Sequence, residues 1–306
     1  MRFYDLIVSD NKGRQVKRWT THPNGKYDAG AQNIMFDIIV APFSTPTGGQ
    51  TITIEGISLD DLRHATDFAG LNFQLYAGMK KGLPLANELQ SGVIAIGNIF
   101  QSFGNWEGTE MSLSFVIYPA SDVLNLVLNW PANTQLSVAI SNMLAIAFPG
   151  VTVNMNIGSY TAGYDQHGAN DTMDEMCQVI AGLTGGKVKI VLQNGALDVF
   201  DATYKPQAKR LLFTDLIGQP TWIAVKEMQF KTVLRADISL GSIIQMPVGS
   251  SNVPGQVIAT GQSYPSGIDY KTTFSGDFSV IESRQIGNSR SAEGAQWASI
   301  FTVVPA

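Results

Sequence analysis

Short runs in which apolar and polar residues alternate dominate the first 120 residues of this chain. The segment from Met111 to Phe115, with the sequence MSLSF, alternates strictly, which is typical of a strand with one buried face. Turn sequences at residues 11–13 and 23–25 separate neighbouring runs. The pattern predicts a β-meander, interrupted by a short helix that Ser58 caps. Its strands are expected over residues 3–9, 15–21, 33–41, 50–57, 72–76, 92–103 and 111–118.

Helical spacing begins after residue 120. Apolar residues recur at intervals of three and four between Leu136 and Ala147, which predicts a helix that Thr134 caps. Thr172 and Glu175 form a capping-box pattern for a second helix. The Asn-Gly pair at residues 194–195 predicts a β-hairpin, because both residues tolerate the positive φ angles of a tight turn. Residues 121–205 are therefore expected to form a small α/β module with strands over 124–130, 151–157, 187–192 and 196–200.

The β pattern returns towards the end of the chain. Strands are expected over residues 221–230, 232–239 and 241–246, and a closing hairpin over 277–285 and 296–304. Between them, residues 247–266 are rich in Gly, Ser and Pro and are expected to be mobile or ordered by a partner. The fold class is thus mainly β with a small α+β insert. Three domains are expected, over residues 1–120, 121–205 and 206–306.

Composition narrows the class of function. The 306 residues are 44% hydrophobic, enough for one large core or several small ones, and only 15% are charged. A weakly charged polar surface suits contact with other proteins. The net charge is −5 and the sequence has no cluster of basic residues, which argues against binding to nucleic acid. No secretory signal or membrane span is expected, and the single Cys177 excludes an intramolecular disulfide.

Candidate catalytic histidines are few. His22 precedes a turn and His64 falls on the expected helix after Ser58, where structural roles are favoured. His167 lies in an expected polar loop, residues 164–171, that offers oxygen ligands for a metal. No second His or Cys stands at ligand spacing from it, so the sequence assigns no metal.

Other chemical motifs have structural explanations. The adjacent acidic pairs Asp60-Asp61 and Asp174-Glu175 fall in first helical turns, where they oppose the helix dipole. Residues 182–187 resemble a phosphate loop, but they run from helix into strand, the reverse of that motif. Cys177 lies among apolar helical residues and is expected to be an inert buried thiol. The five tryptophans are expected to anchor cores or subunit contacts: Trp19, Trp106, Trp130, Trp222 and Trp297.

Several glycine-bracketed segments specify backbone shape and hold no catalytic group. They lie at residues 76–79, 81–87 and 104–109, and are followed by the Leu-Asn-Trp-Pro segment at 128–131. Together with residues 278–290, Trp297 and Phe301, these segments resemble those of baseplate hub proteins from long-tailed bacteriophages. The resemblance covers most of the chain. It departs at Gln285, where the resemblance would place a His.

The resemblance implies a homotrimeric structural protein without catalytic residues or cofactors. Two tube-like β domains per chain, of the barrel or sandwich kind, would form a pseudo-sixfold ring, matching a hexameric tail tube to a threefold spike. The implied partners are tail-tube or distal-tail proteins, the spike and baseplate wedge components. The genome would pass through the channel without specific binding. The implied location is the distal end of the virion tail, after synthesis in the host cytoplasm, and the implied role is in host cell infection.

Two alternatives of other classes stay open from the residues alone. Scattered Asp and Glu residues and the His167 segment are compatible with a cell-wall hydrolase carried on a tail. Exposed tryptophans would suit a carbohydrate-binding tail-tip protein. The sequence itself does not assign the interface residues of any of these functions.

Overall fold

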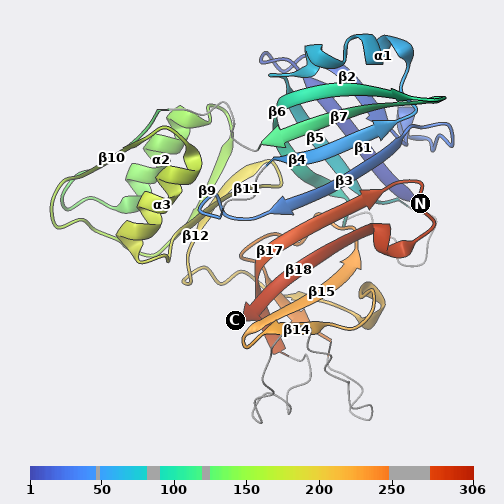
Figure 1. Cartoon of the computed structure of the whole chain (residues 1–306). Helices are drawn as coiled ribbons and strands as arrows, with labels where there is room; N and C mark the ends of the chain where they lie inside the picture. Colours follow the sequence, from blue (N-terminus) through green and yellow to red (C-terminus); the bar gives the residue numbers. More distant parts are fainter. Residues whose placement is uncertain (46–48, 81–89, 119–124, 248–275) are drawn as a thin grey trace, which may run out of the picture.

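The computed structural model describes residues 1–45, 49–80, 90–118, 125–247 and 276–306. The chain forms a first β region, an insert that contains the two long helices, and a second β region (Figure 1). The protein is mainly β with a small helical insert, which confirms the expected fold class. The expected glycine-bracketed segment at 81–87, the boundary near residue 120 and most of the 247–266 loop lie outside the described residues.

The first β region is a curled antiparallel sheet around its own core. Its strands follow the order β3-β4-β7-β6-β5-β1-β2. Inward-facing residues alternate along each strand, as in Ile52 and Ile54, and both are fully buried. Ser58 accepts a hydrogen bond from the Asp61 amide, so the predicted helix cap is confirmed. The elements are β1 Arg2–Ser9, β2 Gln15–Thr20, β3 Asn33–Val40, β4 Gln50–Glu55, α1 Leu59–Arg63, η2 Ala65–Phe68, β5 Asn72–Met79, β6 Gly92–Glu107 and β7 Glu110–Tyr118, with a 3-10 turn η1 at Pro23–Gly25.

The insert packs two helices against short strands over a second core. Thr172 caps α3 through the Glu175 amide, and Asn194 and Gly195 take φ angles of 52° and 77° in the hairpin turn, both as predicted. The predicted cap of α2 is wrong, because Thr134 donates its hydroxyl to the Pro131 carbonyl and Gln135 holds the N-cap position. The elements are β8 Leu126–Trp130, α2 Leu136–Ala147, β9 Thr152–Asn156, β10 Gln166–Asn170, α3 Met173–Thr184, β11 Lys189–Gln193 and β12 Ala196–Phe200.

The second β region differs from its predicted strands over residues 221–239, and the short strand β13 was not predicted. The strand expected over residues 221–230 is a hairpin, because the chain turns at the exposed Val225 and Lys226. The following strand then ends at Val233, and residues 234–239 are not a strand. The closing hairpin is present as predicted. The elements are β13 Lys209–Arg210, η4 Phe213–Asp215, β14 Thr221–Ala224, β15 Glu227–Val233, β16 Ile243–Met246, β17 Gly276–Asn288, η6 Gly294–Gln296 and β18 Trp297–Pro305.

The two β regions share one strand order. The second region runs β14-β15-β18-β17-β16-β13, and the first runs β3-β4-β7-β6-β5-β1. Each strand of the second region occupies the same place along the chain as its counterpart in the first. Two differences stand out: β2 has no counterpart among the described residues, and β13 pairs in parallel whereas β1 pairs antiparallel.

Local irregularities repeat at matching positions. The β6–β7 register shifts between Ile99 and Gln101, and the β17–β18 register shifts between Val280 and Glu282. Immediately after each bulge a buried serine lies opposite a buried phenylalanine. These pairs are Ser102 with Phe115 and Ser283 with Phe301. Bulges fix the register and twist of a hairpin, so both long hairpins are bent in the same way.

The chain approaches each bulge through the same backbone contact. Gly70 has a φ of 80° and donates its N–H to the Ile99 carbonyl at 2.7 Å. Gly241 has a φ of 79° and donates to the Val280 carbonyl at 2.9 Å. This left-handed conformation favours glycine. The shared conformation and bonding show that the two β regions are built on one plan, although their sequences give no visible repeat.

Candidate functional site: the junction of the three regions

The three histidines have separate sets of neighbours. His22 packs edge-on against Phe3 and Tyr27, and its burial, with the positive charges of Lys80 and the N-terminus, lowers its pKa. His64 is exposed and its Nδ1 lies 2.9 Å from the Asp67 carboxylate. The predicted loop around His167 is wrong, because residues 166–170 form β10 and pair with β8. In the part of the chain that the structure describes, no three His, Cys, Asp or Glu residues gather to hold a metal.

The remaining chemical candidates are held in structural contacts. Asp61 is buried and its carboxylate pairs with Lys17 Nζ at 2.5 Å. Cys177 is 3% exposed within α3, and burial raises its pKa, with a smaller contribution from Asp174. Burial also raises the pKa of Asp174, with Glu175 adding to the effect. A protonated, inaccessible thiol is a poor nucleophile, which agrees with the structural interpretation of Cys177.

The tryptophans do not form one exposed aromatic face. Trp19, Trp130 and Trp297 are buried in cores, Trp222 is half-buried, and Trp106 has an exposed fraction of 63%. The five tryptophans therefore do not form a shared sugar-binding platform, since Trp106 is the one with a largely exposed ring.

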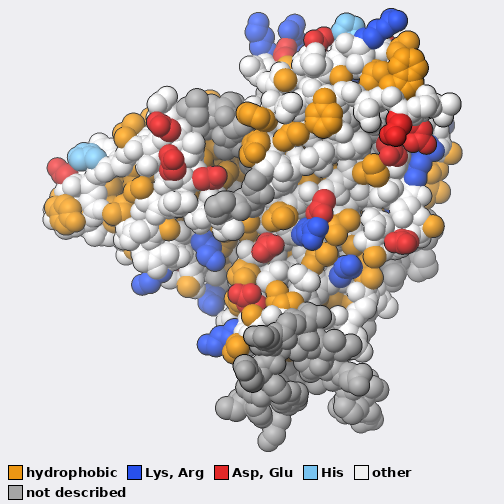
Figure 2. All heavy atoms as spheres, viewed as in Figure 1, with side chains coloured by type: hydrophobic (Ala, Val, Ile, Leu, Met, Phe, Trp, Pro, Cys, Tyr) orange, Lys and Arg blue, Asp and Glu red, His pale blue; other side chains and the backbone are white. Residues whose placement is uncertain are grey.

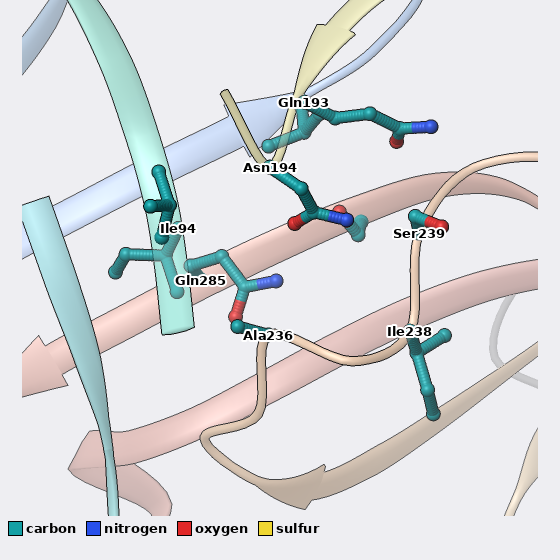
Figure 3. A pocket seen from close by; sticks show the side chains of 10 residues that line it. Ile94, Gln193, Asn194, Ala236, Ile238, Ser239 and Gln285 are labelled. Carbon is teal, nitrogen blue, oxygen red and sulfur yellow. The ribbon is translucent and has the colours of Figure 1, made fainter. Parts of the chain in front are cut away.

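Residues from all three regions meet around the turn of the β11–β12 hairpin. Gln193 is the last residue of β11 before this turn, and its amide oxygen accepts from the Leu240 N–H at 2.8 Å. Its amide nitrogen donates to the Leu240 carbonyl at 3.1 Å and to Asp198 at 2.7 Å. Oriented so that its nitrogen faces acceptors, the Asn194 amide donates to the carbonyl oxygens of Val93 and Ala236 at 3.2 Å. The hairpin therefore ties the insert to both β regions (Figure 3).

The cavity at this junction is too small for a substrate. It has a volume of about 20 Å³ and is bordered by side chains that include Ile94, Asn194, Ser239 and Gln285 (Figure 3). That volume is close to what a single water molecule requires. The junction is thus a packed contact between regions, with its polar groups paired to one another.

A buried polar cluster stabilises the second β region beside this cavity. Arg235 is 6% exposed and forms a bidentate pair with Asp237, with both nitrogen-to-oxygen distances at 2.7 Å. Ser299 donates its hydroxyl to Gln285, the position where the resemblance would place a His, and accepts from the Arg235 N–H. Gln285 therefore has a clear structural role. Sequence reasoning missed Gln193 and Arg235, although a lone Arg within an apolar stretch is a usable signal for a buried pair.

The β17–β3 pairing joins the second β region to the first. Ser283 to Asn288 of β17 lie opposite Val40 to Met35 of β3, so one sheet continues through both regions (Figure 1). On its exposed face, Arg284 forms a bidentate ion pair with Asp37. Trp297 of β18 reaches into the core of the first region and donates its indole N–H to the Gly78 carbonyl at 2.9 Å.

The surface carries no strongly charged block on the face seen in Figure 2, where Lys, Arg, Asp and Glu side chains are scattered among uncharged atoms. Exposed apolar side chains include Phe100, Phe103 and Trp106 along β6. None of the helices among the described residues is long and apolar enough to cross a membrane.

Comparisons with known proteins find likeness at the level of structure. No protein-family model and no curated protein sequence matches the chain. A tail protein from Neisseria meningitidis MC58 matches with a TM-score of 0.53 and 10% identity, covering 98% of this chain and 96% of that one. The 43 kDa tail protein of prophage MuSo2 from Shewanella oneidensis matches with a TM-score of 0.52 and 8% identity, covering 100% and 97%.

A third structure comes from another assembly. A chain of a PdpA–VgrG complex in its lidless form matches with a TM-score of 0.51 and 7% identity, covering 100% of this chain and 66% of that one. At these identities the likeness concerns the fold alone. The chain has the fold of phage tail proteins.

Proposed function

We propose that this protein is a structural baseplate hub of a phage tail, and that three copies form a ring with pseudo-sixfold symmetry. The ring joins the tail tube to the central spike and the baseplate. Residues 1–120 and 206–306 act as its two tube-like domains, and residues 121–205 form the insert domain. The role is structural and requires no catalytic residue or cofactor.

The observation that carries this proposal is the shared plan of the two β regions. Two similar lobes in one chain, joined edge to edge, give a trimer six similar lobes, and a six-lobed ring can match a hexameric tube above and a threefold spike below. The fold neighbours support the proposal, since two are tail proteins and the third belongs to a VgrG complex.

The proposed partners follow from the position of such a ring. Tail-tube or distal-tail proteins contact one face, the spike contacts the other, and baseplate wedge components contact the outside. The genome passes through the central channel, and the net charge of −5 disfavours its retention there. The proposed location is the distal end of the tail in the virion.

Electron microscopy and mass measurement test the proposal. The purified chain, of 33.0 kDa, is expected to reach three times that mass in mass photometry and to give threefold rings with an axial channel. A protein that stays a monomer across a concentration series, and is missing from the tip of purified tails, contradicts it.

A zymogram on bacterial cell walls addresses the hydrolase alternative. We expect no clearing from the purified protein. Clearing that disappears when a single carboxylate is replaced by its amide contradicts a purely structural role, because a scaffold does not depend on one ionisable group.

A further inference from the structure

Within the chain, β17 of the second β region pairs with β3 of the first. The corresponding strands of the opposite regions, β6 and β14, make no such pairing in the described structure. Because β6 corresponds to β17 and β14 corresponds to β3, the shared plan predicts a β6–β14 pairing. The two β regions of one chain already meet through β17 and β3, so β6 can reach a β14 strand only in another copy. We infer that the arm of β6, Gln101–Glu107, pairs edge to edge with β14, Thr221–Ala224, of a second copy. This inference rests on the proposed ring.

The arm of β6 has an open backbone edge. The pairing of β6 with β5 ends at Asn98, and the backbone of Ile99 bonds to Gly70 and Leu71. Beyond Ile99, β6 continues for eight residues beside β7. Among the described residues, the backbone of the arm pairs only within the β6–β7 hairpin. In β17 the equivalent stretch, residues 283–288, is the part that pairs with β3. An open edge of this length is a template for another strand.

The second partner is an edge strand as well. Within the described part of the chain β14 pairs only with β15, and it ends the sheet order. Its counterpart β3 pairs with β4 on one side and β17 on the other. The outer edge of β14 is therefore the position that a β6 arm would occupy.

The bulges and pairings fix the register. Ser102 and Ser283 occupy equivalent positions after their bulges, so Asn105 corresponds to Ile286 and Phe103 to Arg284. The register of β14 follows from that of β15. Ile52 of β4 lies opposite Phe115, and Phe230 of β15 lies opposite Phe301, so Ile52 and Phe230 are equivalent. Counting across to the neighbouring strands β3 and β14 makes Thr221 equivalent to Asp37. Ile286 lies opposite Asp37 within the chain. Asn105 is thus expected opposite Thr221 of the neighbour, and Phe103 opposite Ile223.

The side chains suit a contact that is buried only after assembly. Phe103 and Trp106 have exposed fractions of 44% and 63% on the arm, and aromatic residues of this kind anchor protein interfaces. At the junction within the chain the position of Phe103 is held by Arg284, which pairs with Asp37. In the expected register the counterpart of the Arg284–Asp37 ion pair is Phe103 beside Thr221, and the position directly opposite Phe103 is the apolar Ile223.

Such a contact is head-to-tail, because β6 of one copy meets β14 of the next. Head-to-tail interfaces close into rings when the rotation permits and otherwise form filaments. In such a ring the β17–β3 pairing within each copy alternates with the β6–β14 pairing between copies. The sheet then continues around the ring, and the outer edges of β6 and β14 are both paired.

Engineered disulfides test the register. The double variant Asn105→Cys/Thr221→Cys is expected to form covalent dimers and trimers under mild oxidation, seen on non-reducing gels. The variant Asp37→Cys/Ile286→Cys, opposed within one chain, serves as the positive control and stays a monomer covalently. The variant Asn105→Cys/Val16→Cys, which places the second cysteine on the edge strand β2, is the negative control. Native Cys177 is buried and does not interfere.

The outcomes separate the inference from the proposed function. Cross-linked dimers and trimers specific to the Asn105/Thr221 pair support both. A threefold ring that gives no such cross-link overturns the β6–β14 contact and leaves the hub proposal standing. A protein that stays monomeric and gives no cross-link contradicts both.

A second pair of variants tests the arm without cysteines. Phe103→Glu is expected to weaken trimer formation at least about tenfold in mass photometry, because a carboxylate would be buried between strands. Ile146→Glu, at an 83% exposed position on α2, is the matched control and is expected to leave assembly unchanged. Equal effects of the two changes overturn the inference, and circular dichroism verifies that both variants fold.

Discussion

At the scale of single residues, the contact between the two β regions depends on a missing side chain. Gly287 of β17 lies directly opposite Phe36 of β3. A Cβ at Gly287 would lie 2.1 Å from the Phe36 ring, which is buried and packs edge-on against Trp297 at a centroid distance of 5.6 Å. The backbone of β17 can therefore approach β3 only where no side chain intervenes.

Substitution of this glycine tests the close approach. Gly287→Ala is expected to lower the free energy of unfolding by about 1–3 kcal/mol, because the ring must move within a packed core. Urea unfolding gives the value. Gly294→Ala is the control, since nothing lies within 4 Å of a Cβ there and its φ is not positive. A loss at Gly287 no larger than that at Gly294 contradicts the argument.

At the scale of elements, the β11–β12 hairpin fastens the insert to the sheet. Its turn places Gln193 against the backbone of Leu240, whose N–H and C=O both bond to the one side chain. Phe43 adds a backbone bond to the Ile190 carbonyl at 2.9 Å. The insert is thereby attached through main-chain groups of both β regions.

Removal of the Gln193 amide tests this attachment. Gln193→Ala leaves buried Leu240 groups without partners, so we expect a loss of about 1–3 kcal/mol in unfolding free energy. We also expect faster hydrogen exchange at the Leu240 amide. Asn154→Ala removes an exposed hydrogen bond to the same Asp198 and is expected to cost less. Unchanged exchange at Leu240 would show that the hairpin does not hold the junction.

At the scale of the whole molecule, the two β regions share a sheet and part of a core. Trp297 belongs to the second region in sequence and is 1% exposed among residues of the first. Leu234 is fully buried in the same cluster. Neither β region can open without exposing the other's apolar surface, which favours joint unfolding.

Native-state hydrogen exchange tests this coupling. The most protected amides of β4 and β15 are expected to report the same opening free energy, because both strands belong to one cooperative unit. Strands β8 and β12 of the insert, which has its own core, serve as the comparison. Clearly different opening free energies for β4 and β15 would contradict the shared unit.

Local sequence signals predicted most elements of the fold. The Ser58 and Thr172 hydroxyls each accept a hydrogen bond from the amide three residues later, as their capping patterns predict. Asn194 and Gly195 have the positive φ angles that the hairpin turn requires. Prediction failed where local and tertiary effects compete. The run over residues 221–230 has no strong turn residue, yet it folds back at Val225 because β15 pairs with β18 from Met228 onwards.

The candidate assembly surfaces were beyond sequence reasoning. The sequence predicts residues 101–103 as the end of a strand and 104–109 as a glycine-bracketed segment. The open edge of β6 is visible only when the ends of the β5 and β7 pairings are known.

The sequence by itself determined most of the strands and turns and the helix caps at Ser58 and Thr172, because these depend on neighbours a few residues away. The tertiary structure decided that the two β regions share one plan and that β17 pairs with β3. Those features arise from backbone pairing between strands almost 250 residues apart, as where Arg284 lies opposite Ile39. Backbone groups are the same for nearly every residue type, so the side-chain pattern does not encode which edge meets which.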